Sequence, residues 1–199
     1  MSAEAQLTPM MAQYRRIKSE LPKDALLLFR LGDFYEMFFN DALSAAPVLG
    51  IALTQRNKKS SDETPMCGVP HHSISGPINK LLAAGFKIAI CDQIEDPKTA
   101  KGIVKRAVTR VLTPGVVYDP ATLDGTLSHY LCAFEQVPAD QNRPAKNRSP
   151  DFIVSFLDAT TGEAFYYECP ERSLQSLFQT MPIAEIVIGP GQEVVKTDR

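Results

Sequence analysis

The stretch ALLLFRLGDFYEMFF, residues 25–39, constrains the fold more than any other part of this sequence. Two apolar runs flank a Gly-Asp pair. Such a pair between strand-like runs is typical of a tight β-hairpin, because glycine tolerates the positive φ that the turn requires. If residues 34–39 are extended, their side chains alternate between the two faces of a sheet. One face then carries Phe34, Glu36 and Phe38, and the other carries Tyr35, Met37 and Phe39.

The face that carries the carboxylate is the better candidate for solvent or a ligand. The hairpin therefore predicts an exposed aromatic residue, Phe34, beside Glu36. The alternative is a single helix from Asp33 to Leu49, in which these two residues flank the apolar stripe on opposite edges. We favour the hairpin, followed by a helix that begins near Asn40 or Asp41 and ends at Gly50.

The segments around this hairpin alternate between helix-like and strand-like patterns. Thr8 and Pro9 are typical of a helix start, and apolar residues at helical spacing predict a helix that ends before Pro22. In the strand predicted at 104–112, Arg106 and Arg110 share one face by alternation. The other expected elements are a strand at 51–56, a Pro-bounded segment at 65–72, a helix at 76–85, a strand at 86–94 and a short helix at 96–101. Strands and helices that interleave in this way predict an α/β domain, residues 1–120, with a mixed β-sheet flanked by helices.

A second, smaller unit is expected over residues 121–199. Its pattern is strand, strand, strand, helix, strand, at 129–135, 151–158, 163–168, 170–180 and 184–189. Such a run is only part of a sheet-and-helix domain, so we expect this unit to be truncated.

The amino-acid composition is that of a globular protein rather than a membrane-spanning or secreted one. Hydrophobic residues make up 44% and charged residues 22%, the balance of a globular protein, and no apolar run is long enough to span a membrane. The N-terminus lacks the apolar region of a signal peptide, and the four cysteines form no C-x-x-C pair. We therefore expect a cytoplasmic protein with reduced thiols and no metal site.

The charge is unevenly distributed along the chain, although the net charge is only −2. Residues 1–120 carry 15 Lys and Arg against 12 Asp and Glu, whereas residues 121–199 carry 6 against 11. The segment 97–110 holds five basic residues and no acidic one, and Lys58 and Lys59 extend the sequence QRNKK. An asymmetry of this kind points toward a polyanionic partner, but on charge alone we favour a solvated charged surface.

Six motifs occur in an order and spacing that resemble the N-terminus of the MutS family of DNA mismatch-repair proteins. They are TPMMAQYRRIK, LLLFRLGDFYEMFFNDA, LGIALTQR, PMCGVPHH, AICDQIEDP and RVLTPG. The resemblance covers about Thr8 to Tyr118 as the mismatch-recognition domain. The remainder resembles the start of the family's connector domain, which has an RNase-H-like fold.

The resemblance implies double-stranded DNA with mismatches or small loops as the partner. The family's Phe-x-Glu motif falls here on Phe34 and Glu36. It implies that Phe34 enters the minor groove, stacks on the mispaired base and kinks the duplex, as apolar wedges do. By resemblance, Arg56, Met66 and Arg110 also face the DNA, and charge alone adds four further candidates, Lys58, Lys59, Lys105 and Arg106.

The protonation state of Glu36 is left open by the sequence. An ionised carboxylate would accept a hydrogen bond from a thymine or guanine imino N–H. A protonated one would donate to a purine acceptor, and desolvation and nearby phosphates would favour that form. Either hydrogen bond would offset the repulsion between Glu36 and the DNA backbone only where a base is exposed.

Two other functions are possible alternatives to mismatch recognition. A metal-dependent nuclease would use carboxylates such as Asp92, Glu95 or Asp158. A protein-interaction module would leave the basic residues merely solvated. The family hydrolyses ATP with magnesium and forms homodimers, but no P-loop motif occurs here, so we expect a monomeric chain without catalytic residues, nucleotide or cofactor.

Overall fold

The computed structural model describes residues 8–56, 64–96, 100, 102–116, 118–119, 128–137 and 152–189. The chain divides into two units, Met1–Pro114 and Gly115–Arg199, and each is described by itself. Both are mixed α/β units, which confirms the predicted fold class. The domains predicted at 1–120 and 121–199, and the connector nature of the second, stay predictions.

The predicted hairpin lies at the centre of the first unit's sheet. β1 (Ala25–Leu31) and β2 (Phe34–Phe38) pair antiparallel, and Gly32 has a φ of 57° in the turn between them. The six-stranded sheet has the order β3-β4-β2-β1-β5-β6, in which only β1 and β5 are parallel. The remaining strands are β3 (Thr54–Arg56), β4 (Thr64–Pro70), β5 (Lys87–Gln93) and β6 (Arg106–Leu112).

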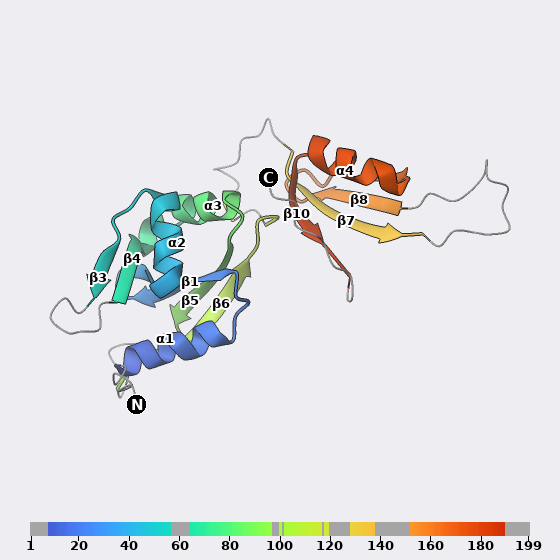
Figure 1. Cartoon of the computed structure of the whole chain (residues 1–199). Helices are drawn as coiled ribbons and strands as arrows, with labels where there is room; N and C mark the ends of the chain where they lie inside the picture. Colours follow the sequence, from blue (N-terminus) through green and yellow to red (C-terminus); the bar gives the residue numbers. More distant parts are fainter. Residues whose placement is uncertain are drawn as a thin grey trace, which may run out of the picture. The chain divides into compact units, whose positions relative to one another are not determined.

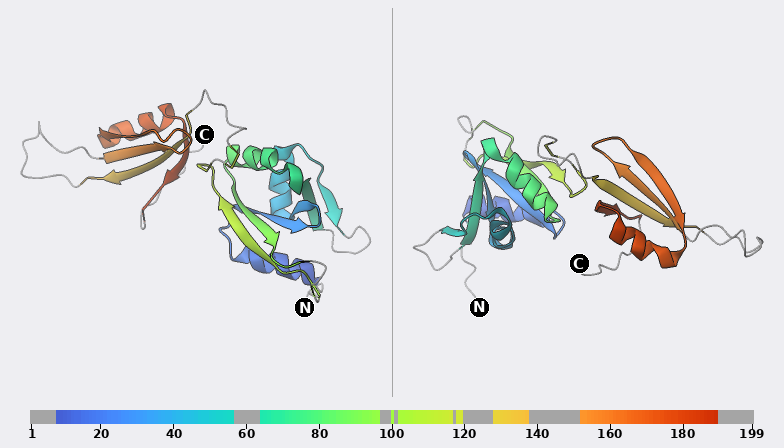
Figure 2. Two further views of the ribbon diagram at one scale, coloured as in Figure 1. Left: turned by 180° about the vertical axis from the view of Figure 1, so that it is seen from behind. Right: turned by 90° about the horizontal axis from the view of Figure 1, so that it is seen from above.

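Helices cover both faces of this sheet (Figures 1 and 2). α1 (Pro9–Ser19) begins as predicted, with the Thr8 hydroxyl accepting a hydrogen bond from the backbone N–H of Met11 at 3.4 Å. It packs on one face against a cluster of buried residues from β1, β2 and β5. The other face is covered by α2 (Phe39–Leu49) and α3 (Ser75–Ala83), and a short 3-10 helix (His71–Ser73) precedes α3. α2 ends at Gly50, as the sequence predicts.

Asp41 connects three of these elements. Its buried carboxylate accepts hydrogen bonds from the Tyr14 hydroxyl at 3.1 Å and from the backbone N–H of Leu27 at 2.9 Å. Its second oxygen forms an ion pair with the Lys18 ammonium at 2.8 Å. The carboxylate therefore joins α1, β1 and the start of α2.

Two predictions about this unit are wrong. The Pro-bounded segment at 65–72 is largely a strand, β4, which pairs with both β2 and β3. Phe39 does not continue β2 on the face of Tyr35. It begins α2 with a φ of 54°, and its ring packs beside Tyr14 on the α1 side. The short helix expected at 96–101 falls mostly outside the described residues.

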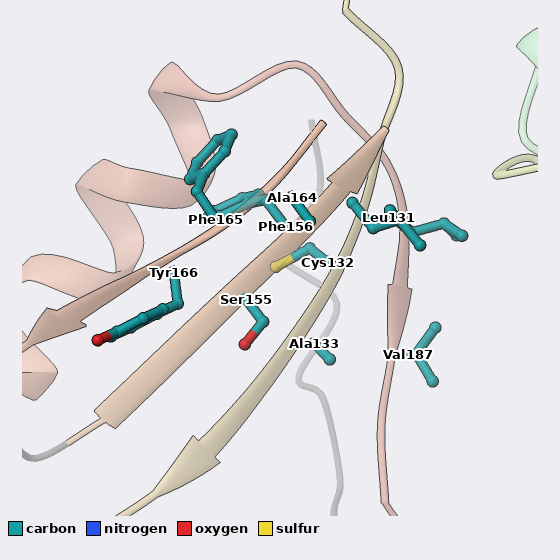
Figure 3. A pocket seen from close by; sticks show the side chains of 10 residues that line it. Leu131, Cys132, Ala133, Ser155, Phe156, Ala164, Phe165, Tyr166 and Val187 are labelled. Atoms are coloured by element: carbon teal, nitrogen blue, oxygen red, sulfur yellow. The ribbon is translucent and has the colours of Figure 1, made fainter. Parts of the chain in front are cut away.

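The second unit contains a four-stranded sheet of order β10-β7-β8-β9. Its elements match the sequence prediction and are β7 (Tyr130–Gln136), β8 (Phe152–Asp158), β9 (Ala164–Cys169), α4 (Glu171–Thr180) and β10 (Ile183–Val187). α4 packs on one face over an aromatic cluster. The opposite face forms an open apolar depression of about 560 Å³ that includes Leu131, Ala133, Ser155, Tyr166 and Val187 (Figure 3).

Candidate nucleic-acid interface

Phe34 is the first residue of β2, directly after the hairpin turn. Its side chain is 46% exposed, whereas the next residue, Tyr35, is buried. Register with Leu31 places Phe34 on the same face as Phe29 and α1. The sequence prediction of an exposed aromatic residue on the carboxylate's face is therefore confirmed for its exposure and its face.

Glu36 lies two residues farther along the same face, and its side chain is only 19% exposed. Across the sheet it faces Phe29 on β1 and Gly68 on β4. A Cβ atom at Gly68 would lie 3.3 Å from the Glu36 Cγ atom, so the glycine makes room for this side chain. Burial raises the pKa of the Glu36 carboxyl, and the charge of Arg56 opposes that rise.

Arg56 is brought to Glu36 by strand pairing. β3 pairs with β4 and β4 with β2, so Arg56 lies on the same face as Glu36 although 20 residues separate them. The Arg56 Nη1 atom is 3.3 Å from the Glu36 Oε2 atom, and the guanidinium lies 5.7 Å from the centroid of the Phe38 ring. Its side chain remains 38% exposed.

Met66 belongs to the same face. It pairs with Phe38 on one side and Thr54 on the other, is partly buried, and packs against the α1 cluster. The structure thus brings together four of the predicted site residues, which we call the reading face: Phe34, Glu36, Arg56 and Met66.

Arg106 and Arg110 do not share a face, contrary to the alternation expected from sequence. A bulge in β6 pairs Ile90 with Arg110 but Cys91 with Val108, so the side-chain alternation shifts by one residue at Thr109. Arg110 is therefore exposed on the face opposite Phe34.

Arg106 points inward on the α1 face and is 8% exposed. Its guanidinium lies 4.9 Å from the centroid of the Phe29 ring. It donates to the backbone oxygen of Arg30 at 2.6 Å and to the Gln13 side chain at 3.1 Å. These contacts tie α1 to the sheet, so the geometry gives Arg106 a structural role.

Three basic candidates remain. Lys105 is exposed, and its backbone N–H donates to the Glu95 carboxylate at 2.7 Å. Lys58 and Lys59 lie outside the described residues.

The carboxylates proposed for a nuclease accept hydrogen bonds from neighbouring protein groups. Asp158 is buried and accepts from the backbone N–H of His129 at 3.0 Å and from both the N–H and the hydroxyl of Thr160. The Thr160 hydroxyl is the main cause of its pKa being lowered to about 2. Asp92 accepts from Tyr35 and Thr109, and the described part of the chain contains no cluster of acids, histidines and cysteines that could hold a metal ion.

The hydrogen bond from Tyr35 to Asp92 was not predicted from the sequence, in which Asp92 is a candidate only as a metal-binding carboxylate of a nuclease. The two residues are 57 positions apart, and only the parallel pairing of β1 with β5 brings them together. The signal that was available is the alternation in β2, which turns Tyr35 away from Phe34.

The family model that describes MutS domain I matches residues 8–121. This match covers more than half of the chain. The chain belongs to the MutS domain I family. The matched region contains the whole six-stranded sheet, and with it the reading face.

Curated relatives of this MutS domain I chain are similar over most of its length. It is 47% identical over 178 residues to the DNA mismatch repair protein MutS of Syntrophobacter fumaroxidans, and the aligned region covers 88% of this chain and 19% of that protein. It is 60% identical over 127 residues to the MutS of Nitratidesulfovibrio vulgaris, covering 64% of this chain and 14% of that protein. The chain thus spans about a fifth or less of the length of these relatives. Among the described residues, no helix is long and apolar enough to cross a membrane.

Proposed function

We propose that this chain recognises mismatched or unpaired bases in double-stranded DNA, as part of a mismatch-repair protein. The observation that carries the proposal is an exposed aromatic residue next to a largely buried carboxylate on one sheet face, inside a MutS domain I match. Phe34 is 46% exposed at the end of the hairpin turn, where its ring is accessible to a stacked base.

Phe34 acts as the wedge. It enters from the minor groove and stacks on the mispaired base, which kinks the duplex. Stacking of a base on an aromatic ring contributes about 1–3 kcal/mol. That is too little to unstack well-paired DNA, but it favours a step that is already weakened, so discrimination arises mainly from the deformability of the mismatch.

Glu36 hydrogen-bonds the base that the wedge exposes, and Met66 and Arg56 flank it on the same face. Lys105, Lys58 and Lys59 contact phosphates, which position the protein without reading sequence. Arg110 lies on the opposite face of the sheet and does not share this contact. Arg106 supports the sheet beneath the wedge through its bonds to Arg30 and Gln13. In the full-length family the same chain would act with an ATP- and magnesium-binding domain in a homodimer.

DNA bending tests the wedge directly. A duplex with a single G·T mismatch and a fluorescent dye at each end is titrated with the chain, and the dye-to-dye distance is followed. We expect the ends to approach in the mismatched duplex only, and we expect Phe34→Ala to abolish the change while retaining the fold. An unchanged end-to-end distance with the wild-type chain bound would contradict the proposal.

A further inference from the structure

The backbone that leads into Phe34 is held by two hydrogen bonds in the hairpin turn. The Arg30 guanidinium donates to the carbonyl oxygen of Gly32. The backbone N–H of His71 donates to the carbonyl oxygen of Asp33 at 2.9 Å. The chain is therefore fixed on the side of Phe34 that faces the turn.

The strand ladder holds Phe34 itself less firmly. Its partner on β4 is Pro70, which has no N–H and can donate no backbone hydrogen bond. The Phe34 side chain is 46% exposed, so packing restrains it only in part. Fixing the strand at this point depends more strongly on the next residue, Tyr35.

Tyr35 reaches across β1 to β5. It pairs with Arg30 on β1, and its hydroxyl donates a hydrogen bond to the Asp92 carboxylate on β5. The second oxygen of that carboxylate accepts a hydrogen bond from Thr109, at the bulge of β6. One row of side chains thus ties the start of β2 to β5 and β6, on the face of the sheet opposite Phe34.

A wedge that is fixed before it meets DNA loses little conformational freedom on binding. Ordering the backbone of one residue costs a free energy of the same size as that which a stacked aromatic ring contributes. If the DNA had to order Phe34, that cost would offset most of the stacking free energy, and little preference for a weakened step would remain. The bonds around Phe34 therefore determine how much of the stacking free energy appears as discrimination.

We propose, as an extension that rests on the proposed function, that Tyr35 is the positioning residue of the wedge: held by Asp92, it fixes Phe34 for stacking before DNA binds. The Tyr35 hydroxyl lies on the face opposite the reading face, so it acts on DNA only through Phe34. Matched DNA offers the wedge no weakened step, so the bond does not alter the affinity for it. The bond between Tyr35 and Asp92 thus sets the selectivity for a mismatch and not the affinity for DNA in general.

The ratio of the affinities for a G·T duplex and its matched counterpart tests this inference. Dissociation constants are measured at low salt for the wild type and for Tyr35→Phe, which keeps the ring and removes only the hydroxyl. We expect the ratio to fall by at least about threefold, the effect of one hydrogen bond, while the affinity for matched DNA stays the same. An unchanged ratio in Tyr35→Phe, or an equal loss of affinity for both duplexes, would overturn the inference.

Two control variants separate positioning from a general loss of stability. Tyr130→Phe removes the same kind of bond in the second unit, where the hydroxyl donates to the Glu163 carboxylate at 2.9 Å. Thr8→Ala removes the hydroxyl that caps α1 in the first unit. We expect both controls to keep the wild-type ratio. A ratio that falls as far in either control as in Tyr35→Phe would overturn the inference.

Asp92→Ala tests whether the carboxylate is the partner through which Tyr35 acts. We expect this variant to lower the ratio at least as far as Tyr35→Phe does. The double variant should match Asp92→Ala alone, because both substitutions break the same bond. Additive effects on the ratio would overturn the assignment to Asp92.

A measurement without DNA follows the wedge itself. NMR relaxation of the Phe34 amide nitrogen gives the order parameter of its backbone in the free chain. We expect a lower order parameter in Tyr35→Phe and the wild-type value in Tyr130→Phe, and equal values in the wild type and Tyr35→Phe would overturn the inference. Equal binding of matched and mismatched duplexes by the wild type would instead contradict the proposed function. A wild-type preference for the mismatch that Tyr35→Phe retains in full would overturn the inference alone.

Discussion

The hydroxyl of Tyr35 donates a hydrogen bond to the carboxylate of Asp92, on the face of the sheet opposite Phe34 and Glu36. The other carboxylate oxygen accepts from the Thr109 hydroxyl at 2.7 Å, and the Arg30 guanidinium lies 5.4 Å from the centroid of the Tyr35 ring. Phe34 and Glu36 are the immediate neighbours of Tyr35 in β2. The bond therefore anchors the strand that presents the reading face.

Tyr35→Phe removes this anchor while it preserves the ring. Because a hydrogen bond to a charged group contributes about 1.5–3 kcal/mol, we expect the free energy of unfolding to fall by about that amount in urea titrations. A double-mutant cycle with Asp92→Asn isolates the pair. Additive effects of the two substitutions would show that the hydroxyl and the carboxylate do not interact.

The raised pKa of Tyr35 predicts that the free energy of unfolding falls at alkaline pH. Burial, followed by the hydrogen bond to Asp92, raises its pKa to about 12 from the ordinary value of 10.0. A raised folded-state pKa stabilises the protein fully below pH 10, and that contribution disappears as pH rises from 10 to 12. Absorbance titration near 295 nm should show one late-titrating tyrosine fewer in Tyr35→Phe than in the wild type.

Substitution of Asp41 should lower the stability of the first unit more than substitution at most other positions. Its buried carboxylate pairs with Lys18 and binds Tyr14 and the backbone of Leu27. Removal of one partner from a buried pair destabilises by about 3–5 kcal/mol, and the partial exposure of Lys18 lowers our expectation for Asp41→Ala to about 2–4 kcal/mol. The exposed pair of Lys87 and Asp24 is the control, since Asp24→Ala should change stability by less than about 1 kcal/mol. Equal losses at the two positions in urea unfolding would refute this ranking.

Gly68 and Gly76 form a matched pair of glycine positions. A Cβ atom at Gly68 would lie 3.3 Å from both the Glu36 Cγ atom and the Tyr35 carbonyl oxygen, whereas one at Gly76 in α3 meets nothing within 4 Å. We expect Gly68→Ala to lower the melting temperature and to weaken mismatch discrimination, because Glu36 must shift. Gly76→Ala should instead stabilise by up to about 1 kcal/mol. A Gly68→Ala variant with wild-type melting and discrimination would show that the close packing is unimportant.

The second unit should lose stability in acid through Asp158. Its pKa is lowered to about 2 from 3.8, chiefly by the Thr160 hydroxyl. A lowered folded-state pKa stabilises above pH 4, and this contribution, about 1–2 kcal/mol, is lost as pH falls from 4 to 2. Hydrogen exchange of β7 and β8 amides should accelerate over this range in the wild type. In Asp158→Asn the same amides should exchange faster already at neutral pH and with little further dependence on pH.

Local patterns were sufficient to predict the hairpin, the helices α1 to α4 and the exposure of Phe34. Gly-Asp between apolar runs specifies the turn, and alternation places Phe34 and Glu36 together, since both depend on residues close in sequence. Features set by pairing between distant strands could not be predicted. β4 was missed because Pro65, Gly68 and Pro70 all disfavour strands, yet Gly68 is required opposite Glu36.

The arginine positions illustrate the same limit. The bulge at Thr109 moves Arg106 into the interior, and nothing in the alternation of residues 104–112 reveals it. The pair of Arg56 and Glu36 depends on two successive strand registers, β3 on β4 and β4 on β2. Charge alone marked Arg106 as a DNA contact, whereas its hydrogen bonds give it a role in joining α1 to the sheet.

The central claim is that Phe34 reads the mismatch, and one ratio tests it most directly. The affinity of the chain for a duplex with a single G·T mismatch is divided by its affinity for the matched duplex at low salt, for the wild type and for Phe34→Ala. We predict a ratio above one that falls to one in Phe34→Ala, while the affinity for matched DNA stays the same. Equal affinity of the wild-type chain for both duplexes, unchanged by the substitution, would contradict the claim.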